Sequence, residues 1–261
     1  IHRLNVMAID KISGKAYTDI DEFSGVATSA ISNISGVTAS STPPFITANL
    51  KSRYTPATYS GSGALVDTVS GHNITVNGAT YSSTQPANFD CDGVNDTLIS
   101  SSFTQPNADL SFGQWLNPDV RASGVMIQNG VWSNSAGRGV LLYRLSGRTY
   151  SYYQANSLSN VPSNPSYAPF NQWFYMCWSR NATTKLIRMW KCDVNGVTQL
   201  ISTTGGSATS VAGSVNFMAS GQTATSGFYN GQVGDYHVYD DDLGTAEWTQ
   251  NFNAQKAYYG L

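Results

Sequence analysis

Most enzymes that hydrolyse a glycosidic bond use a pair of carboxyl groups, one as the acid and one as the nucleophile or base. The sequence has only two glutamates, Glu22 and Glu247, which lie near its opposite ends. Asp235 and His237 share one face of a predicted strand and are the one candidate catalytic pair. We favour the other interpretation, in which Asp235 is structural and His237 lies at the surface or edge. The three histidines show neither Ser-His-Asp nor zinc-ligand spacing. We therefore predict no catalytic site.

A second group of oxygen-bearing side chains lies within seven residues of sequence, namely Asp90, Asp92, Asn95 and Asp96. Carboxylate and amide oxygens are the ligands that calcium prefers, so these four residues are our candidate metal ligands. The alternative is that Asp92-Gly93 and Asn95-Asp96 are turn residues whose side chains bond their own backbone. The spacing alone leaves both interpretations open.

The segment "QNGVWSNSAGRG" (Gln128–Gly139) combines one large aromatic side chain with several hydrogen-bonding groups. A tryptophan in a loop can stack on a sugar ring while neighbouring amide and guanidinium groups bond its hydroxyls. With the tyrosines of "YSYYQANS", the candidate carbohydrate-binding residues are Trp132, Asn129, Asn134, Arg138, Tyr152 and Tyr153. The alternative is that these aromatic residues belong to the core or to contacts between subunits, where they are also enriched.

The overall composition is that of a β-rich chain with few charges. Charged residues are 11% of the chain, against about 25% in average domains. Serine, threonine, asparagine and 24 glycines take their place, a mixture typical of many short strands joined by turns. Fifteen tyrosines suit contacts with neutral ligands such as sugars or with other proteins. The net charge of −2 gives nucleic acid no basic patch to bind.

The chain has three cysteines, an odd number that cannot all pair internally: Cys91, Cys177 and Cys192. The last two lie on one predicted hairpin that turns through Asn181–Thr184. That register sets them opposite Arg188 and Trp173, too far apart for a disulfide. We therefore predict three reduced, mostly buried thiols, as expected after folding in a reducing cytoplasm.

No apolar run approaches the roughly 18 residues that a membrane span needs. The first residues, "IHRLNVMAID", lack the apolar core of a signal peptide. A chain made in the cytoplasm with a composition resembling that of lectins indicates a virus particle that lysis releases.

From Leu65 onward, strand patterns recur at about eight to twelve residues, which is typical of a sandwich or barrel. The Asn77-Gly78 pair is a strong hairpin signal. In "LSFGQWLNP", period-two alternation sets Trp115 on one face and three apolar residues on the other: Leu110, Phe112 and Leu116. "QWFYMCWSRNATTKLIRMWKCDVNG" is the clearest hairpin of all.

One helix is predicted near the end, in "LGTAEWTQNFNAQKAYYG". Thr245 can cap it, and Glu247 lies in the first turn, where the helix dipole favours an anion. Trp248 and Phe252 lie one turn apart on a single face. We expect that face to pack across one edge of the sandwich.

The first 40 residues contain an eleven-residue repeat, with copies "IDKISG", "IDEFSG" and "ISNISG". Units this short need neighbouring units or other chains to bury an apolar face. The period also fits a helical supercoil, but the glycine in each unit and the serine, threonine, valine and isoleucine content favour extended segments broken at Ser-Gly turns. We assign residues 1–40 to a repeat arm, 41–64 to a polar linker with three prolines, and 65–261 to the folded domain.

Four segments follow in order: "FDCDGVNDTL" (Phe89–Leu98), "LSFGQWLNP" (Leu110–Pro118), "NQWFYMCW" (Asn171–Trp178) and "FYNGQVGDYHVYDDDLGTAEW" (Phe228–Trp248). Together they resemble strands of the concanavalin A-like lectin/glucanase jelly roll, in its laminin-G-like branch, although the first carries an apparent Cys-Asp insertion. The resemblance implies an all-β fold, an antiparallel β-sandwich jelly roll with a short C-terminal helix and an extended N-terminal repeat arm. It also implies that calcium can bind at a rim of the sandwich.

Tandem Ile-x-x-Ile-x-Gly-Val units ahead of such a domain resemble tail-fibre, head-fibre and capsid-decoration proteins of tailed phages. We therefore expect a non-enzymatic virion structural protein, made in the host cytoplasm, whose lectin-like domain adheres to host-surface or environmental glycans. Residues 1–40 would contact other virion proteins and copies of the chain itself, with no nucleic acid bound and no membrane insertion. Two alternatives remain open: a glycan-cleaving enzyme of the same fold, and a structural cement protein without a ligand.

Overall fold

The computed structural model describes residues 44–100, 103–105, 108–119, 124–130, 138–145, 149–153, 169–204, 211–213, 215–216 and 228–261, and four two-residue strands before residue 44. The chain divides into two compact units, Ile1–Pro43 and Pro44–Leu261. Each unit is described by itself.

The described residues of the first unit form two antiparallel strand pairs, β1 (Lys11–Ile12) with β2 (Lys15–Ala16) and β3 (Glu22–Phe23) with β4 (Val26–Ala27). The second pair follows the first by eleven residues, which is the period of the sequence repeat. In each pair the strands flank a Ser-Gly dipeptide in the sequence. The described parts of the repeat are therefore extended rather than helical.

The second unit contains an eight-stranded antiparallel sheet in the order β18-β17-β16-β12-β21-β9-β8, with β5 also paired to β21. Its strands are β5 (Leu50–Tyr54), β8 (Thr80–Ser82), β9 (Asn88–Asp92), β12 (Leu110–Pro118), β16 (Phe174–Arg180), β17 (Leu186–Asp193), β18 (Gly196–Thr204) and β21 (Asn230–Tyr239). The central strand β21 pairs with β12 along one edge, and with β9 and then β5 along the other.

A seven-stranded sheet has the order β15-β14-β13-β20-β10-β7-β6. Its strands are β6 (Ala64–Leu65), β7 (Ile74–Asn77), β10 (Thr97–Ser100), β13 (Gly124–Gly130), β14 (Arg138–Leu145), β15 (Thr149–Tyr153) and β20 (Val215–Asn216), and a separate pair is formed by β11 (Phe103–Gln105) and β19 (Val211–Gly213). Apolar side chains of both larger sheets share one core. The antiparallel β-sandwich predicted from the sequence is confirmed.

Strand β12 shows how the sequence builds this arrangement. Leu110, Phe112 and Leu116 point into the core between the sheets, and Trp115 points into a second core on the outer face of the eight-stranded sheet. The predicted alternation is confirmed, because successive side chains of a strand point to opposite faces.

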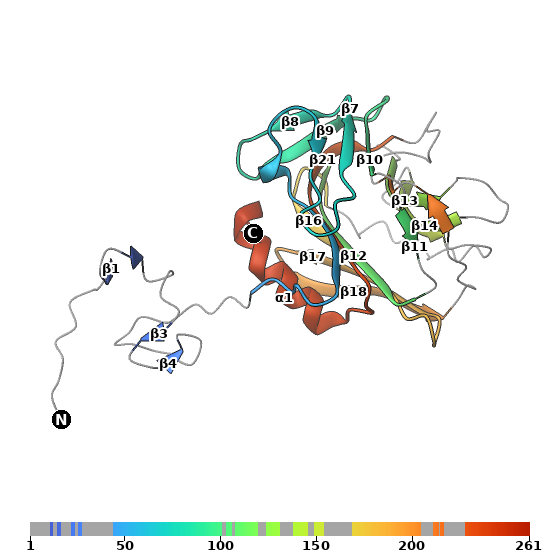
Figure 1. The fold of residues 1–261 in the computed structure, drawn as a ribbon. Coiled ribbons are helices and arrows are strands. Elements are labelled where there is room, and N and C mark those ends of the chain that lie inside the picture. The colour runs from blue at the N-terminus through green and yellow to red at the C-terminus, as the bar shows by residue number, and fades with distance from the viewer. Residues whose placement is uncertain are drawn as a thin grey trace. The chain divides into compact units, whose positions relative to one another are not determined.

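The second core lies beneath helix α1 (Thr245–Gln255) and the 3₁₀ turn η4 (Lys256–Tyr259); one more 3₁₀ turn, η3 (Pro56–Thr58), follows β5. Trp248 and Phe252 of α1 pack with Trp115 and other aromatic residues of the sheet. The helix therefore covers the outer face of the sheet, and not an edge as predicted (Figure 1). None of the helices in the described part of the chain combines the length and apolar character that crossing a membrane requires.

The helix cap also differs from the prediction. Gly244 is the N-cap residue, and its backbone N–H donates to the Glu247 carboxylate at 3.0 Å. Thr245, the predicted cap, instead accepts a hydrogen bond from Trp190 Nε1 at 3.0 Å. Glu247 does lie in the first turn, where its charge complements the helix dipole.

The boundary of the folded domain lies earlier than predicted. The prediction assigns residues 41–64 to a linker, but within that range β5 forms a full strand of the larger sheet, with Tyr54 opposite Tyr236. The residues before β5 also bind α1, because the Ile46 N–H donates to Asn251 Oδ1 at 2.9 Å. Although this segment is polar in sequence, it folds because β21 and α1 supply its partners, so it needs no core of its own.

The Asn77-Gly78 pair turns the chain, as predicted, but does not form a hairpin. β7 pairs within the seven-stranded sheet and β8 within the eight-stranded sheet, so this turn carries the chain from one sheet to the other. Gly78 has a φ of 81° and approaches Asp96 so closely that a Cβ atom would lie 2.0 Å from Oδ1. Glycine is needed here for both reasons.

The β16–β17 hairpin forms with a register two residues away from the predicted one. Its last strand pair is Arg180 with Ile187, because the connecting loop is longer than four residues. Cys177 and Cys192 are therefore diagonal neighbours with sulfur atoms 3.9 Å apart, much closer than we expected. All three cysteines are nevertheless buried thiols, as predicted.

Candidate functional site

The predicted carbohydrate-binding residues fall partly outside the described residues, where Trp132 and Asn134 lie. The backbone of the others lies on three neighbouring strands at one end of the seven-stranded sheet: Asn129 on β13, Arg138 on β14, and Tyr152 and Tyr153 on β15. The register sets Arg138 opposite Gly130, next to Asn129 in sequence. The strands therefore bring these positions to one region, and sugar binding there stays a prediction.

The predicted metal ligands lie where the chain passes from β9 to β10. Asp96 Oδ2 accepts a hydrogen bond from the Asp92 N–H at 2.9 Å, and Asp92 Oδ1 accepts one from the Val94 N–H at 2.7 Å. Partial burial, then the charges of Asp119 and Asp96, raise the pKa of Asp90. Within the described residues, no three His, Cys, Asp or Glu side chains are grouped to hold a metal ion. The geometry favours the turn interpretation, and calcium stays a prediction.

Asp235 lies in a buried network that joins β21 to the C-terminal helical segment. Its Oδ2 accepts hydrogen bonds from Gln255 Nε2 at 3.0 Å and from Thr55 Oγ1 at 3.3 Å. Its Oδ1 accepts one from the Tyr259 hydroxyl at 3.1 Å, and that hydroxyl also accepts the Asp235 N–H at 2.7 Å. Gln255 Oε1 accepts a further bond from Trp115 Nε1 at 2.9 Å. Each polar group in this set has a partner from another element.

His237 lies beside Asp235 and is 0% exposed, so its predicted place at the surface or edge is wrong. Its Nδ1 lies 3.2 Å from the Tyr175 hydroxyl and its Nε2 lies 3.4 Å from Gln255 Nε2. Phe45 covers the imidazole with a ring-centroid distance of 4.4 Å. The sequence around His237 gave no sign of burial, because the covering groups come from residues far away in the chain.

Burial sets the protonation of this pair. Burial raises the pKa of Asp235 to about 6, although the nearby Arg53 charge acts in the opposite direction. Burial, and then the Arg53 charge, hold the pKa of His237 well below its usual value. The imidazole is therefore neutral near pH 7, and both groups are sealed beneath the helix. This arrangement suits a structural role and leaves a substrate no access.

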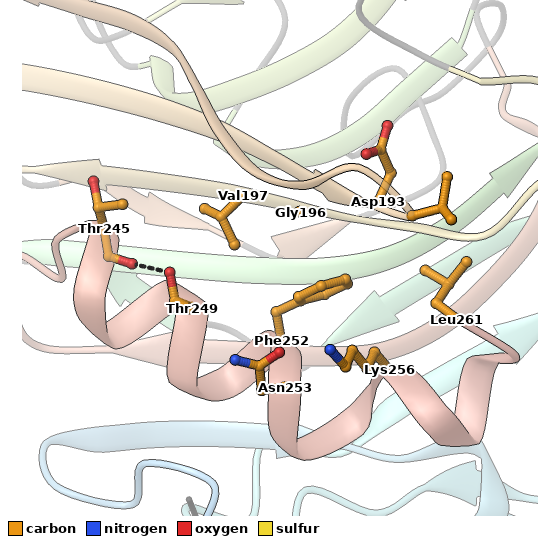
Figure 2. A pocket seen from close by; sticks show the side chains of 10 residues that line it. Asp193, Gly196, Val197, Thr245, Thr249, Phe252, Asn253, Lys256 and Leu261 are labelled. Carbon is orange, nitrogen blue, oxygen red and sulfur yellow. Dashed lines mark hydrogen bonds between the residues drawn. The ribbon is translucent and has the colours of Figure 1, made fainter. Parts of the chain in front are cut away.

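A solvent-facing groove lies on the other flank of α1, against the turn between β17 and β18 (Figure 2). Its volume is about 310 Å³. The residues that line it are Asp193, Val194, Gly196 and Val197 from the turn, and Thr245, Thr249, Phe252, Asn253, Lys256 and Leu261 from the C-terminal segment. The polar side chains of α1 in this lining recur at helical spacing, a pattern that is visible in the sequence.

Of the two charged side chains that line this groove, Asp193 has an ion-pair partner in the described residues and Lys256 has none. Asp193 is buried and forms an ion pair with Lys191 at 2.7 Å. Lys256 Nζ lies 5.7 Å from the centroid of the Phe252 ring, within the range of a cation–π contact. Within the described part of the chain, no acidic side chain pairs with Lys256. The groove can therefore offer one uncompensated cation to a ligand.

No protein-family model matches the sequence, and no curated protein matches it. Solved structures do match the fold. Botulinum neurotoxin type C, which depends on interaction with two ganglioside molecules to enter cells, matches at 16% identity and a TM-score of 0.58, over 79% of this chain and 51% of that one. Trypanosoma rangeli sialidase in complex with sialic acid matches at 9% identity and a TM-score of 0.57, over 81% of this chain and 34% of the sialidase chain. The binding domain of botulinum neurotoxin DC in complex with SialylT matches at 14% identity and a TM-score of 0.55, over 79% of this chain and 51% of that one.

These similarities extend over about four fifths of the chain, at identities that establish the fold alone. The chain spans about half the length of the toxin chains and about a third of the sialidase chain. The antiparallel β-sandwich is thus shared with parts of larger proteins, and a fold of this kind hosts many functions.

Proposed function

We propose that this chain is a non-enzymatic structural protein of a phage virion, a fibre, knob or capsid decoration. Its sandwich binds glycans of a host or environmental surface. Its N-terminal repeats bind other virion proteins or copies of the chain itself. The observation that carries the glycan-binding part is the β-sandwich. It is similar over most of its length to a toxin that interacts with gangliosides and to a toxin binding domain in complex with SialylT.

The acidic side chains support the absence of hydrolysis. Glu247 is engaged by the cap of α1, and Asp235 accepts hydrogen bonds from three side chains in a buried network. A glycosidase of the usual kind needs two carboxyl groups on either side of an accessible bond. Asp235 has no access to such a bond, so binding rather than cleavage fits this arrangement.

The repeat supports assembly with other chains. Each described strand of the first unit has two residues and one antiparallel partner. An isolated two-stranded hairpin is marginally stable at best in water, so such units gain stability from stacking on further units or chains. Many copies on one particle would also convert weak glycan binding into strong adhesion.

A glycan array probed with the purified full chain tests the binding function. We expect binding to a subset of surface glycans and no release of reducing ends from them. A blank array supports the cement alternative, and reducing-end release supports the enzyme alternative; either result overturns the proposal. Microscopy of source particles with labelled protein tests the location, and label on neither capsid nor tail would overturn the virion role.

A further inference from the structure

The groove beside α1 presents hydrogen-bonding groups in a row. Thr245, Thr249 and Asn253 follow one another at four-residue spacing, and Lys256 continues the row by three residues. Residues three and four apart lie on one face of a helix, so the row runs along the groove. Figure 2 shows the Asn253 amide and the Lys256 ammonium close to the Phe252 ring. The Thr249 hydroxyl donates to the Thr245 carbonyl oxygen at 2.7 Å, so it can bind a ligand only as an acceptor.

The opposite wall and the floor of the groove are largely apolar. Val197, Phe252 and Leu261 contribute apolar surface, and Gly196 adds no side chain to narrow the space. A ligand that fits needs an apolar face as well as hydroxyl groups, which describes a sugar ring. The volume of about 310 Å³ is at the lower end of small-molecule pockets, roughly 300 Å³. It therefore suits one sugar unit.

The charge of the groove determines which class of sugar it would bind. The Asp193 carboxylate already has Lys191 at 2.7 Å, so it needs no cation from a ligand. Lys256 brings a positive charge without a paired carboxylate in the described residues. Charge-assisted hydrogen bonds between an ammonium and a carboxylate are stronger than those between neutral groups. We propose that this groove binds a sugar unit that carries a carboxylate, with Lys256 holding the carboxylate and Asn253 and Thr249 bonding hydroxyls.

This inference rests on the proposed glycan-binding function and gives it a site and a ligand class. A structural role for Lys256 is the competing explanation, because a cation at the end of a helix also stabilises the helix dipole. The two explanations differ in their readouts. A structural lysine changes stability and leaves ligand preference unchanged, whereas a binding lysine changes the preference between acidic and neutral sugars.

The test compares sialyllactose and trigalacturonic acid with neutral lactose, by calorimetry on the full chain. We expect at least one acidic probe to bind at least about tenfold more tightly than lactose, because the bond to Lys256 is charge-assisted. Lys256→Met should remove that preference, and Lys256→Arg should retain it. Lys51→Met removes the same charge from a residue that does not line the groove and is paired with Asp240, and should change nothing. Asn253→Leu should weaken both acidic and neutral probes.

Thermal unfolding of each variant checks that it is folded. Should Lys256→Met fail to fold, Asn253→Leu and a salt titration of the wild-type chain still test the site, because screening weakens an ionic contact. The inference is overturned by equal binding of acidic and neutral probes, or by acidic binding that Lys256→Met leaves intact. If a glycan array is positive in that case, the proposed function survives without this site. If the array is blank, both fail.

Discussion

The two faces of the eight-stranded sheet are both buried, but they are built differently. The inner face meets the seven-stranded sheet with apolar and aromatic side chains such as Phe89, Phe112 and Trp178. The outer face also meets α1 with aromatic rings. Among them is Trp115, which stacks on Tyr259 with a ring-centroid distance of 4.0 Å. Beside these rings, however, it also holds the hydrogen-bonded network around Asp235 and His237.

This difference shows how two cores can be made specific in different ways. Apolar packing tolerates substitutions of similar volume, so the inner core depends on overall shape and pattern. A buried polar network requires each partner, because one removed group leaves another buried group unsatisfied. The outer core should therefore fix the position of α1 and η4, and with them one wall of the groove.

Removing β5 should have the largest effect, because this strand serves both faces. On the inner side, Tyr54 stacks on Tyr236 with a ring-centroid distance of 5.8 Å. On the outer side, Thr55, directly after the strand, donates a hydrogen bond to Asp235. Deletion of residues 1–64 should cost more than about 5 kcal/mol, the lower end of domain stability, and abolish cooperative unfolding. Urea denaturation followed by tryptophan fluorescence measures this.

Deletion of residues 1–43 is the matched control, since the compact unit begins at Pro44. This shorter deletion should leave the unfolding midpoint of the sandwich unchanged. If the longer deletion also unfolds cooperatively at the wild-type midpoint, then neither face depends on β5 and our domain boundary is wrong.

Trp248→Ala should destabilise the chain next most strongly. The side chain is 0% exposed and contacts Trp190 and Tyr239 at ring-centroid distances of 6.3 and 6.0 Å. Truncation of a buried tryptophan typically costs about 3–5 kcal/mol. Phe112→Ala gives the inner-face counterpart, and Val194→Ala, at 72% exposure, gives a surface control. A loss for Trp248→Ala no greater than for Val194→Ala would mean that α1 adds little to the outer core.

Asp235→Asn should cost about 1–3 kcal/mol at pH 7, because three donors then face a side chain that has lost one acceptor. The charge is removed while the shape is kept, so the change tests the network and not the packing. Thermal and urea unfolding measure the loss. An equal or greater stability for the variant would mean that the buried charge costs more than its hydrogen bonds contribute.

The same variant predicts a change in pH dependence. The pKa of Asp235 rises from 3.8 in the unfolded chain to about 6 in the folded one, so the folded state binds the proton more tightly. The free energy of unfolding should therefore decrease, through this group, as pH rises from 3.8 to about 6. Asp235→Asn should lack that decrease, and the difference between the two stability curves isolates it from other carboxyl groups. Parallel curves would contradict the raised pKa.

Much of the inner core was predictable from local patterns. Alternation in β12 placed Leu110, Phe112 and Leu116 correctly, with Trp115 on the opposite face. The β16–β17 hairpin and the C-terminal helix were also predictable, because their apolar periods lie within one short segment. The outer core was only half predictable: the apolar face of α1 was visible, but not the surface on which it packs.

The remaining errors concern partners that are distant in sequence. The strand β5 is short and polar, and it is a strand because β21 offers it an edge. The Asn77-Gly78 signal reports a turn, but no local signal says which sheet follows it. The groove combines residues 193–197 with 245–261, so it cannot be predicted from either segment alone. The polar residues at helical spacing from Thr245 to Lys256 do indicate one of its walls.

Glu247→Ala should give the smallest effect, about 0.5–1 kcal/mol, because it removes one cap contact at an exposed helix end. The carboxylate accepts the Gly244 N–H at 3.0 Å and touches neither Asp235 nor His237. Glu247→Gln keeps the acceptor and removes the charge, so it should recover about half of the loss. Urea midpoints of the two variants measure this. A loss of stability as large as that of Asp235→Asn would mean that the first turn of α1 and the buried network unfold as one unit. The cap of the helix would then stabilise the outer core as much as the buried hydrogen bonds do.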